Sequence, residues 1–235
     1  DKAVELMNSR AKMLGMNGTV YTDCTGVGEG NVTTAKDTAL LCSELKKYKN
    51  LTPYLTCWLD TVRDGKVELV NLNRLVRTYK GVTGMKAWGS EKAGSCIAAT
   101  AEKGDMSVCV VLNGCDSQED MNAEAKKLLN LAFDTYEIYT PELPEDMVKE
   151  TVVCGGEELS VKLAPEGLYP IVIPRGTYRM VECDFTAEEK LDAPVKNGET
   201  AGEIRYTMGG EVILEGKIVA CKEVKKMNFI CGIKK

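Results

Sequence analysis

Residues 71–114 leave this chain few possible folds, because short apolar runs alternate there with glycines and turn residues. The runs at residues 96–100 and 108–112 contain β-branched and small apolar side chains, which is typical of buried strands. A charged turn at residues 102–105 joins them, so the sequence predicts a hairpin. Lys86 lies just before this hairpin and is the first candidate for a functional charge. Four glycines in the same region predict tight turns or close approaches of another group: Gly81, Gly84, Gly89 and Gly94.

The composition narrows the possible functions. The 235 residues are 44% hydrophobic and 28% charged, which is typical of a globular protein with one or two domains. A net charge of -5 argues against a nucleic-acid partner. The chain has no histidine, which excludes an imidazole base and a histidine-bound metal. We therefore expect neither a metal nor another cofactor.

Ten cysteines are scattered along the chain without a C-x-x-C pair. This spacing argues against a zinc ribbon and against a thioredoxin-type motif. Most of the cysteines lie in apolar runs, where a free thiol behaves as a small hydrophobic group. The sequence therefore predicts buried, reduced thiols and indicates a reducing or anaerobic setting.

The segments before residue 71 predict helices and a second hairpin. Residues 2–14 place apolar side chains on one helical face, which ends at Gly15. Thr34 and Asp37 have the spacing of a helix cap, and we interpret Asp37 as a capping residue. The Arg-Asp-Gly sequence at residues 63–65, between two apolar runs, predicts the hairpin.

The pattern changes in the last hundred residues. Residues 119–133 predict a helix that packs on the sheet, and two prolines predict a linker at residues 140–149. We therefore expect two domains, residues 1–139 and residues 150–235, of which the second is a small all-β sandwich. Its predicted strands are residues 151–153, 159–163, 171–173, 178–183, 204–207 and 212–220.

Residues 71–96 also contain one long sequence motif. Its matching residues are Asn71, Asn73, Leu75, Tyr79, Gly81, Val82, Gly84, Lys86, Ala93, Gly94 and Cys96. They match, without a gap, the phrase N-x-N-x-L-[LV]-x-x-Y-x-G-V-x-G-[LIM]-K-T-G-x-T-x-x-A-G-x-C. The chain thus resembles the low-molecular-weight penicillin-binding proteins, the serine D-alanyl-D-alanine carboxypeptidases. Shorter phrases at residues 7–16, 23–37, 128–133 and 193–202 extend the resemblance over nearly the whole chain.

The resemblance implies an α+β fold, with part of a serine β-lactamase/transpeptidase-like domain before the β-sandwich. It also implies cleavage of peptidoglycan stem peptides by serine acylation, in which an S-x-x-K motif supplies nucleophile and base and an S-x-N motif assists. Neither motif stands at a matching place in this chain. Ser9 and Ser43 begin S-x-x-K sequences, but both lie after the place where the motif belongs. We expect the chain, which opens at Asp1 within a helix, to be a fragment that is inactive by itself.

The third motif of the family, K-T-G, is altered in this chain. It stands at Lys86, Ala87 and Trp88, so the threonine hydroxyl and the glycine are replaced. The resemblance implies that this strand binds the terminal carboxylate of the substrate, helped by an arginine whose place is taken by Met121. These four residues are the candidate substrate-binding residues, and no catalytic residue is expected. For Lys86, a site lysine and a salt-bridged structural lysine both stay open.

Two functions stay open for the whole chain. It is either the C-terminal part of an active carboxypeptidase or a catalytically inactive scaffold or binding module of the penicillin-binding-protein type. The resemblance implies peptidoglycan peptides or β-lactams as ligands, once a missing N-terminal part completes the site, and a place at the extracytoplasmic cell envelope. The incomplete sheet predicts self-association, a rearranged half-domain or a second chain that covers the gap.

The end of the chain is rich in lysine and has two interpretations. It forms either a solvated last strand or the approach to a membrane-surface anchor in the parent protein. The residues concerned are Lys222, Lys225, Lys226, Met227, Phe229, Ile230, Lys234 and Lys235. No signal peptide and no membrane span is expected within the chain itself.

Overall fold

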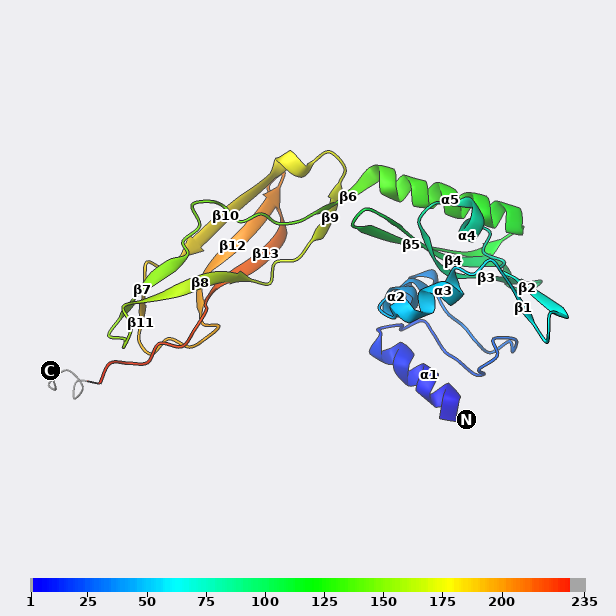
Figure 1. Ribbon diagram of the computed structural model, residues 1–235, viewed down its shortest axis with the longest axis horizontal. Helices are drawn as coiled ribbons and strands as arrows, with labels where there is room; N and C mark the ends of the chain where they lie inside the picture. Colours follow the sequence, from blue (N-terminus) through cyan, green and yellow to red (C-terminus); the bar gives the residue numbers. More distant parts are fainter. Residues whose placement is uncertain (1, 229–235) are drawn as a thin grey trace. The chain divides into compact units, whose positions relative to one another are not determined.

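The computed structural model describes residues 2–228, and the chain divides between Thr135 and Tyr136 into two compact units. The first unit combines helices with antiparallel strands, and the second is built almost entirely of strands (Figure 1). The α+β class predicted from the sequence is confirmed, and each unit is described by itself below.

The first unit contains six helical segments and five strands within its described residues. The helical segments are α1 (Lys2–Met13), α2 (Ala35–Leu45), η1 (Lys49–Leu51), α3 (Thr52–Leu55), α4 (Leu75–Thr78) and α5 (Gln118–Thr135). The strands are β1 (Leu59–Val62), β2 (Val67–Val70), β3 (Val82–Ser90), β4 (Gly94–Lys103) and β5 (Met106–Cys115). The predicted helices over residues 2–14 and 119–133 and both predicted hairpins are confirmed.

Strands β3, β4 and β5 form one antiparallel sheet in that order. Helix α5 covers one face of this sheet and helix α2 lies against the other (Figure 1). The face under α5 is the core of the unit, because its side chains and those of α5 exclude water. The buried core residues are Met85, Ala87, Ile97, Ala99, Ala101, Val110, Met121, Ala125, Leu129 and Phe133.

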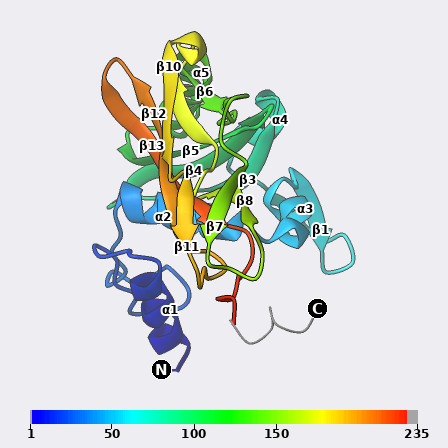
Figure 2. The same ribbon diagram turned by 90° about the vertical axis from the view of Figure 1, so that its left-hand side faces the viewer.

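Helix α1 lies beside α2, on the side away from the sheet (Figure 2). The segment after α1 is tied back by Asn8, whose amide donates to the Tyr21 carbonyl oxygen at 2.7 Å and whose Oδ1 accepts from the Tyr21 amide at 2.9 Å. Thr34 caps α2 as predicted, because its hydroxyl accepts from the Asp37 amide. The interpretation of Asp37 as a cap alone is wrong: its buried carboxylate accepts from Gly18 and Thr19 and so joins α2 to the segment after α1.

The first unit leaves apolar surface uncovered. Every residue of the hairpin β1–β2 is exposed, although Leu59, Val62, Val67 and Leu69 are apolar. The outer edge of β5 has no strand partner within residues 2–228, because the sheet ends there. A ten-residue strand edge and an apolar hairpin are features that proteins normally cover, which agrees with the incomplete sheet inferred from the sequence.

The second unit contains eight strands and one short 3-10 helix within its described residues. The strands are β6 (Tyr136–Tyr139), β7 (Glu150–Cys154), β8 (Ser160–Glu166), β9 (Ile171–Pro174), β10 (Val181–Ala187), β11 (Lys190–Asp192), β12 (Thr200–Met208) and β13 (Glu211–Ala220), and the 3-10 helix is η2 (Tyr178–Met180). Six strands form one sheet in the order β10-β12-β13-β8-β7-β11, and β6 pairs with β9. The sequence did not predict β6 or β11, and the strand predicted from residue 178 begins only at Val181.

The buried interior of the second unit lies between these strands, and its largest fully buried side chains include Tyr206, Ile204, Ile218 and Val161. The Tyr206 hydroxyl donates to the Glu142 carbonyl oxygen at 2.9 Å, which ties the segment after β6 to the interior. Burial raises the pKa of Tyr206, so this phenol stays protonated.

Part of the lysine-rich end is described and packs on the second unit. Val224 is 1% exposed and pairs with Val195, and Lys222 forms an ion pair with Glu158. Phe229, Ile230, Lys234 and Lys235 lie outside the described residues. Within residues 2–228, no helix has both the length and the apolar character needed to cross a bilayer.

Candidate functional site

The start of strand β3 is fixed by a buried asparagine. Asn73 is fully buried, its amide donates to the Gly84 carbonyl oxygen at 3.4 Å, and its Oδ1 accepts from the Leu75 amide at 3.1 Å. A buried polar side chain is stable only when it is hydrogen-bonded in this way. The asparagines of the motif therefore hold the entry to β3 and with it the position of Lys86.

Side chains along β3 alternate between the two faces of the sheet, which decides which of them a ligand can reach. Met85 and Ala87 are buried in the core under α5, whereas Lys86 and Trp88 are exposed on the opposite face. Lys86 pairs with Ala98 and Ala98 pairs with Val111, so one row of side chains crosses the three strands on that face.

This row forms the floor of a groove of about 540 Å³. Its walls come from the loop before α2, from the first turn of α2 and from the ends of β3 and β5. The lining residues are Gly26, Asn31, Val32, Thr33, Thr38, Lys86, Trp88, Ala93, Cys96, Ile97, Ala98, Val111 and Asn113. The groove therefore combines one cation with an exposed indole and a few neutral polar groups.

The loop on the groove's side wall is held by its own side chains. The Asp23 carboxylate accepts from the Thr25 hydroxyl at 2.6 Å and from the Gly26 amide at 2.8 Å. These hydrogen bonds, led by the one from Thr25, lower the pKa of Asp23. Asn31 accepts from the Thr22 amide at 2.7 Å and closes the loop. The groove wall is therefore ordered by local contacts within residues 22–31.

The ammonium group of Lys86 is available for a ligand. Within residues 2–228 it makes no ion pair, whereas Lys46 and Lys92 pair with Glu102 and Glu29. The salt-bridged structural role left open by the sequence therefore has no ion-pair partner among these residues, and the role of Lys86 as a site lysine stays a prediction. Trp88 is 44% exposed beside it and presents an apolar surface to the same groove.

The other two predicted site residues lie elsewhere. Ala87 is 3% exposed and Met121 is 1% exposed, and both are in the core on the α5 side of the sheet. Ser9 and Ser43 are exposed on α1 and α2 and do not line the groove. The structure thus brings Lys86 and Trp88 together and separates Ala87 and Met121 from them.

The groove residues can bind but carry no acylating group. Among the described residues that line it, the hydroxyls belong to Thr33 and Thr38, and neither lies in hydrogen-bond contact with Lys86. Serine acylation needs a hydroxyl next to a base and donors for the oxyanion. An unpaired ammonium beside neutral donors and an indole suits a ligand with a carboxylate and a small apolar part.

Thr38 and Asn113 are groove residues that sequence reasoning missed. Thr38 lies in the first turn of α2 and Asn113 near the end of β5, so they meet only in the folded unit. A sequence signal existed for Asn113 alone, because it directly follows the apolar run at residues 108–112.

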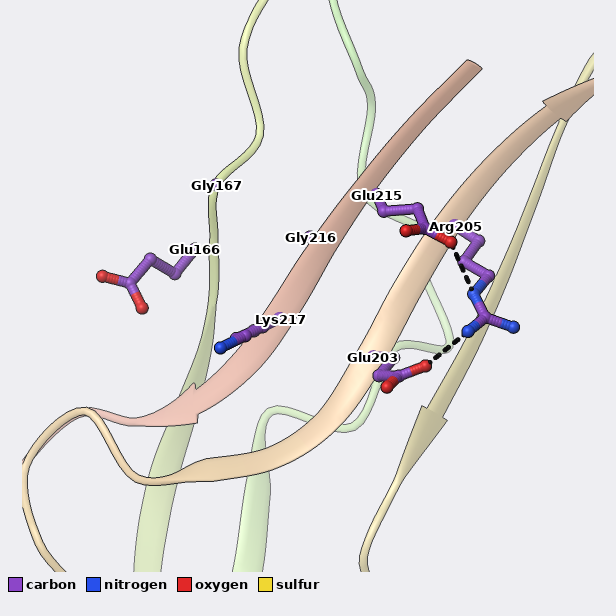
Figure 3. A pocket seen from close by; sticks show the side chains of 7 residues that line it. All are labelled: Glu166, Gly167, Glu203, Arg205, Glu215, Gly216 and Lys217. Atoms are coloured by element: carbon purple, nitrogen blue, oxygen red, sulfur yellow. Dashed lines mark hydrogen bonds and ion pairs between the residues drawn. The ribbon is translucent and has the colours of Figure 1, made fainter. Parts of the chain in front are cut away.

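A second hollow, of about 420 Å³, lies on the second unit (Figure 3). One of its two cations, Arg205, is already paired, with Glu203 at 2.8 Å and with Glu215 at 3.1 Å, and the other, Lys217, lies on the same strand as Glu215. Gly216 in its floor serves packing, since a Cβ there would lie 2.7 Å from Leu168. We therefore regard this hollow as a charged surface of the sheet and place the candidate site at Lys86.

Two protein families match the chain in succession. Residues 1–116 match the family described as D-alanyl-D-alanine carboxypeptidase, and residues 133–226 match the C-terminal domain of penicillin-binding protein 5. The chain is 30% identical over its whole length to the D-alanyl-D-alanine carboxypeptidase DacF of Bacillus subtilis and covers 62% of that protein. It is 29% identical to DacC of Escherichia coli over 96% of the chain and 57% of the relative. The chain thus spans about three fifths of the length of these relatives.

Solved structures show the same fold. Penicillin-binding protein 5 of Haemophilus influenzae matches with a TM-score of 0.79 at 24% identity, over 95% of this chain and 66% of the other. Penicillin-binding protein D2 of Listeria monocytogenes, solved in a cefotaxime-bound form, matches with a TM-score of 0.51 at 27% identity, over 55% of this chain and 54% of the other. These similarities agree with a transpeptidase-like unit followed by a β domain.

Proposed function

The chain belongs to the low-molecular-weight penicillin-binding proteins of the D-alanyl-D-alanine carboxypeptidase family, and from that membership we propose that its groove binds the D-alanyl-D-alanine end of peptidoglycan stem peptides. In this proposal Lys86 binds the terminal carboxylate and Trp88 contacts an alanine methyl group. β-Lactams compete for the same groove. The proposal assigns the acylated serine to a residue outside these 235, since the chain spans about three fifths of its relatives' length.

The unpaired ammonium of Lys86 is the observation that carries the proposal. A lysine held on a rigid strand at the K-T-G position, with no carboxylate beside it among the described residues, leaves its charge for a ligand. Thr38 and Asn113 provide neutral hydrogen-bonding groups at the same groove. A carboxylate gains a charge-assisted hydrogen bond there, while the exposed indole offers apolar contact.

Direct binding of a D-alanyl-D-alanine peptide to the purified chain tests this proposal. Replacing Lys86 by Gln should raise the dissociation constant about two- to fivefold, because a partly exposed ion pair contributes at most about 1 kcal/mol. Lys103→Gln is the matched control, since Lys103 is an exposed lysine at the far end of β4. Equal affinity of wild type and Lys86→Gln, measured by calorimetry or NMR titration, would refute the role given to Lys86.

By itself the chain should not turn over its ligand. The groove lacks a serine among its described lining residues, so no acyl-enzyme can form there. We expect no release of D-alanine from a D-alanyl-D-alanine peptide and no covalent labelling by a fluorescent penicillin. Labelling at Ser9 or Ser43, mapped by peptide mass, would show that one of these S-x-x-K sequences is functional.

The second candidate function is a binding module without catalysis. Trp88 favours it, because a large ring stands where the family's K-T-G motif has glycine and narrows the approach to β3. Trp88→Gly separates the two functions. A carboxypeptidase groove, in which the indole adds one apolar contact beside Lys86, should keep most of its affinity for the peptide after this change, whereas a binding module that depends on the indole should lose its ligand.

We also propose that another chain, or a second copy of this one, covers the first unit. The outer edge of β5 and the apolar hairpin β1–β2 are the surfaces to be covered. Sedimentation velocity of the purified chain should show concentration-dependent association. A monomer at all concentrations with one complete melting transition would contradict this part of the proposal.

The envelope location follows from the same family membership. We propose that the parent protein acts at the extracytoplasmic cell envelope, near the membrane surface. Fractionation of cells that express the parent protein, followed by protease accessibility from outside, tests the location.

A further inference from the structure

Two cysteines outside the groove meet between helix α2 and strand β5. Cys42 is on α2, and Cys109 is on the face of β5 that α2 covers. Both are free thiols. Neither has a part in the proposed binding of peptides, so their meeting calls for a separate explanation.

The spacing of neighbouring residues brings the two thiols together. The Lys46 ammonium donates to the Ser107 hydroxyl and pairs with Glu102 at 2.6 Å, which fixes the end of α2 over the start of β5. One helical turn back, about 6 Å along the axis, lies Cys42. Two residues further along β5, about 6.7 Å away on the same face, lies Cys109. The two steps match, so Cys42 and Cys109 lie opposite each other where α2 packs on β5.

The two thiols differ in access and in acidity. Cys42 is 3% exposed, whereas Cys109 is only partly buried and can be reached from solvent. The hydrogen bond from Cys42 lowers the pKa of Cys109, and the charge of Lys46 adds to this effect. The same interaction and burial raise the pKa of Cys42. Cys109 is therefore the attacking thiol, and Cys42 is the resolving thiol that completes the disulfide.

We propose that Cys42 and Cys109 are a redox-modification site, a dithiol that a small external disulfide converts into a disulfide bond between α2 and β5. The Cys109 thiolate attacks one sulfur of the external disulfide, breaks its S–S bond and releases one thiolate. The Cys42 thiol then gives up its proton, attacks the Cys109 sulfur and expels the second thiolate. The two cysteines lose two electrons, the external disulfide gains them, and the protons of the cysteines end on the released thiols.

A nearby pair of cysteines provides an internal comparison. Cys96 and Cys115 lie on the neighbouring strands β4 and β5, where Ser95 pairs with Cys115. The Cys96 thiol, however, donates to the Ala93 carbonyl oxygen at 3.5 Å. No lysine is among the groups that act on the Cys115 thiol, and burial, the neighbouring Cys96 and nearby acidic residues raise its pKa. The geometry therefore selects Cys42 and Cys109 for fast exchange.

Peptide mapping of the full chain after mild oxidation tests the proposal. The reduced, folded protein is treated at low concentration with oxidised glutathione, its free thiols are blocked, and it is digested with trypsin without reduction. Residues 37–46 contain Cys42, and residues 104–126 contain Cys109 and Cys115. We expect these two peptides to be linked, with fragmentation placing the bond at Cys109. Cys115→Ser should keep the link, and Cys109→Ser should abolish it.

A thermal melt gives the second measurement. Both tryptophans, Trp58 and Trp88, belong to the first unit, so tryptophan fluorescence follows that unit alone. Oxidation should raise its melting temperature in the wild type and in Cys115→Ser but not in Cys109→Ser, and dithiothreitol should reverse the rise. The proposal is overturned if Cys109 stops at a stable glutathione adduct, links to another cysteine, or stays reduced while exposed cysteines react. Circular dichroism of Cys109→Ser checks that the variant is folded.

Discussion

Asp37 places a buried charge at the junction of α2 with the segment after α1, and its replacement should loosen that junction. Its carboxylate accepts from the Gly18 amide at 2.8 Å and from the Thr19 hydroxyl at 2.7 Å, and the side chain is 4% exposed. Burial and the charge of Asp37 together raise the pKa of nearby Tyr21. Asp37→Ala would remove the charge and leave two donors without their acceptor.

The magnitude follows from these two bonds. A hydrogen bond to a charged group stabilises a protein by about 1.5–3 kcal/mol. Gly18 is exposed, so water replaces part of the bond to its amide and the lower value applies. We expect Asp37→Ala to reduce the free energy of unfolding of the first unit by about 3 kcal/mol. Asp37→Asn keeps an acceptor oxygen without the charge and should cost about half as much.

Urea unfolding followed by tryptophan fluorescence measures this effect, because Trp58 and Trp88 both report on the first unit. The denaturation midpoint should fall while the slope m stays constant. Glu91→Ala is the control, since it removes an exposed carboxylate from a turn of the same unit and should change stability by less than about 0.5 kcal/mol.

Local detachment must be distinguished from global unfolding. If the segment around Gly18 detaches while the sheet stays folded, limited proteolysis will cut residues 14–34 faster in Asp37→Ala than in the wild type. A variant that matches Glu91→Ala in both the urea midpoint and the cleavage rate would refute the stabilising role of Asp37.

Three further predictions concern single side chains. Leu129→Ala should lower the free energy of unfolding in urea by about 2–5 kcal/mol, because Leu129 is fully buried between α5 and the sheet. Leu131 is 60% exposed on the same helix, so Leu131→Ala should be nearly neutral. Equal effects would show that α5 does not bury the face assigned to it. Gly81→Ala should destabilise the first unit more than Gly104→Ala in the same assay. Both glycines have positive φ, but only at Gly81 would a Cβ lie 2.4 Å from the Glu102 carbonyl oxygen. A larger effect of Gly104→Ala would contradict this packing. Alkylation of Cys109 by iodoacetamide, followed by peptide mass, should reach half its maximal rate at a pH below about 8.5, the usual pKa of a free cysteine, because a lowered pKa means that thiolate is present at lower pH. If the rate in the folded protein reaches half its maximum only at a pH of about 8.5 or above, Cys109 is not the attacking thiol.

The parts of the fold that could be predicted are those with a strong local pattern. Helix α5 shows apolar residues at helical spacing, and β4 and β5 are apolar runs joined by a charged turn, so local sequence identifies both. Strand β6 escaped because it follows α5 without a break and its partner β9 lies more than thirty residues away. Strand β11 has three residues and pairs in parallel with β7, which gives no turn signal.

The sequence could predict a site residue only within the family motif at residues 71–96. Lys86 could be identified in this way, but the same phrase also pointed to Ala87, whose side chain faces the core because strand residues alternate. Thr38, Asn113 and the contact of Cys42 with Cys109 depend on how α2 crosses β5. No local pattern contains that crossing, because it arises from side chains that meet across sixty or more residues of chain.

One face of helix α2 accounts for three separate features of the first unit. Thr38, Cys42 and Lys46 follow one another at four-residue spacing, so they lie along one stripe of the helix. Thr38 lines the groove, Cys42 meets Cys109, and Lys46 holds Ser107 and Glu102 near the hairpin turn. Cys42 follows Thr38 by four residues, so the dithiol lies one helical turn from the groove. A disulfide between Cys42 and Cys109 would therefore tie α2 to β5 one helical turn away from Thr38, which lines the groove. Lys46 ties the end of the same helix to Glu102 and Ser107, so the disulfide would add a second link between α2 and the sheet.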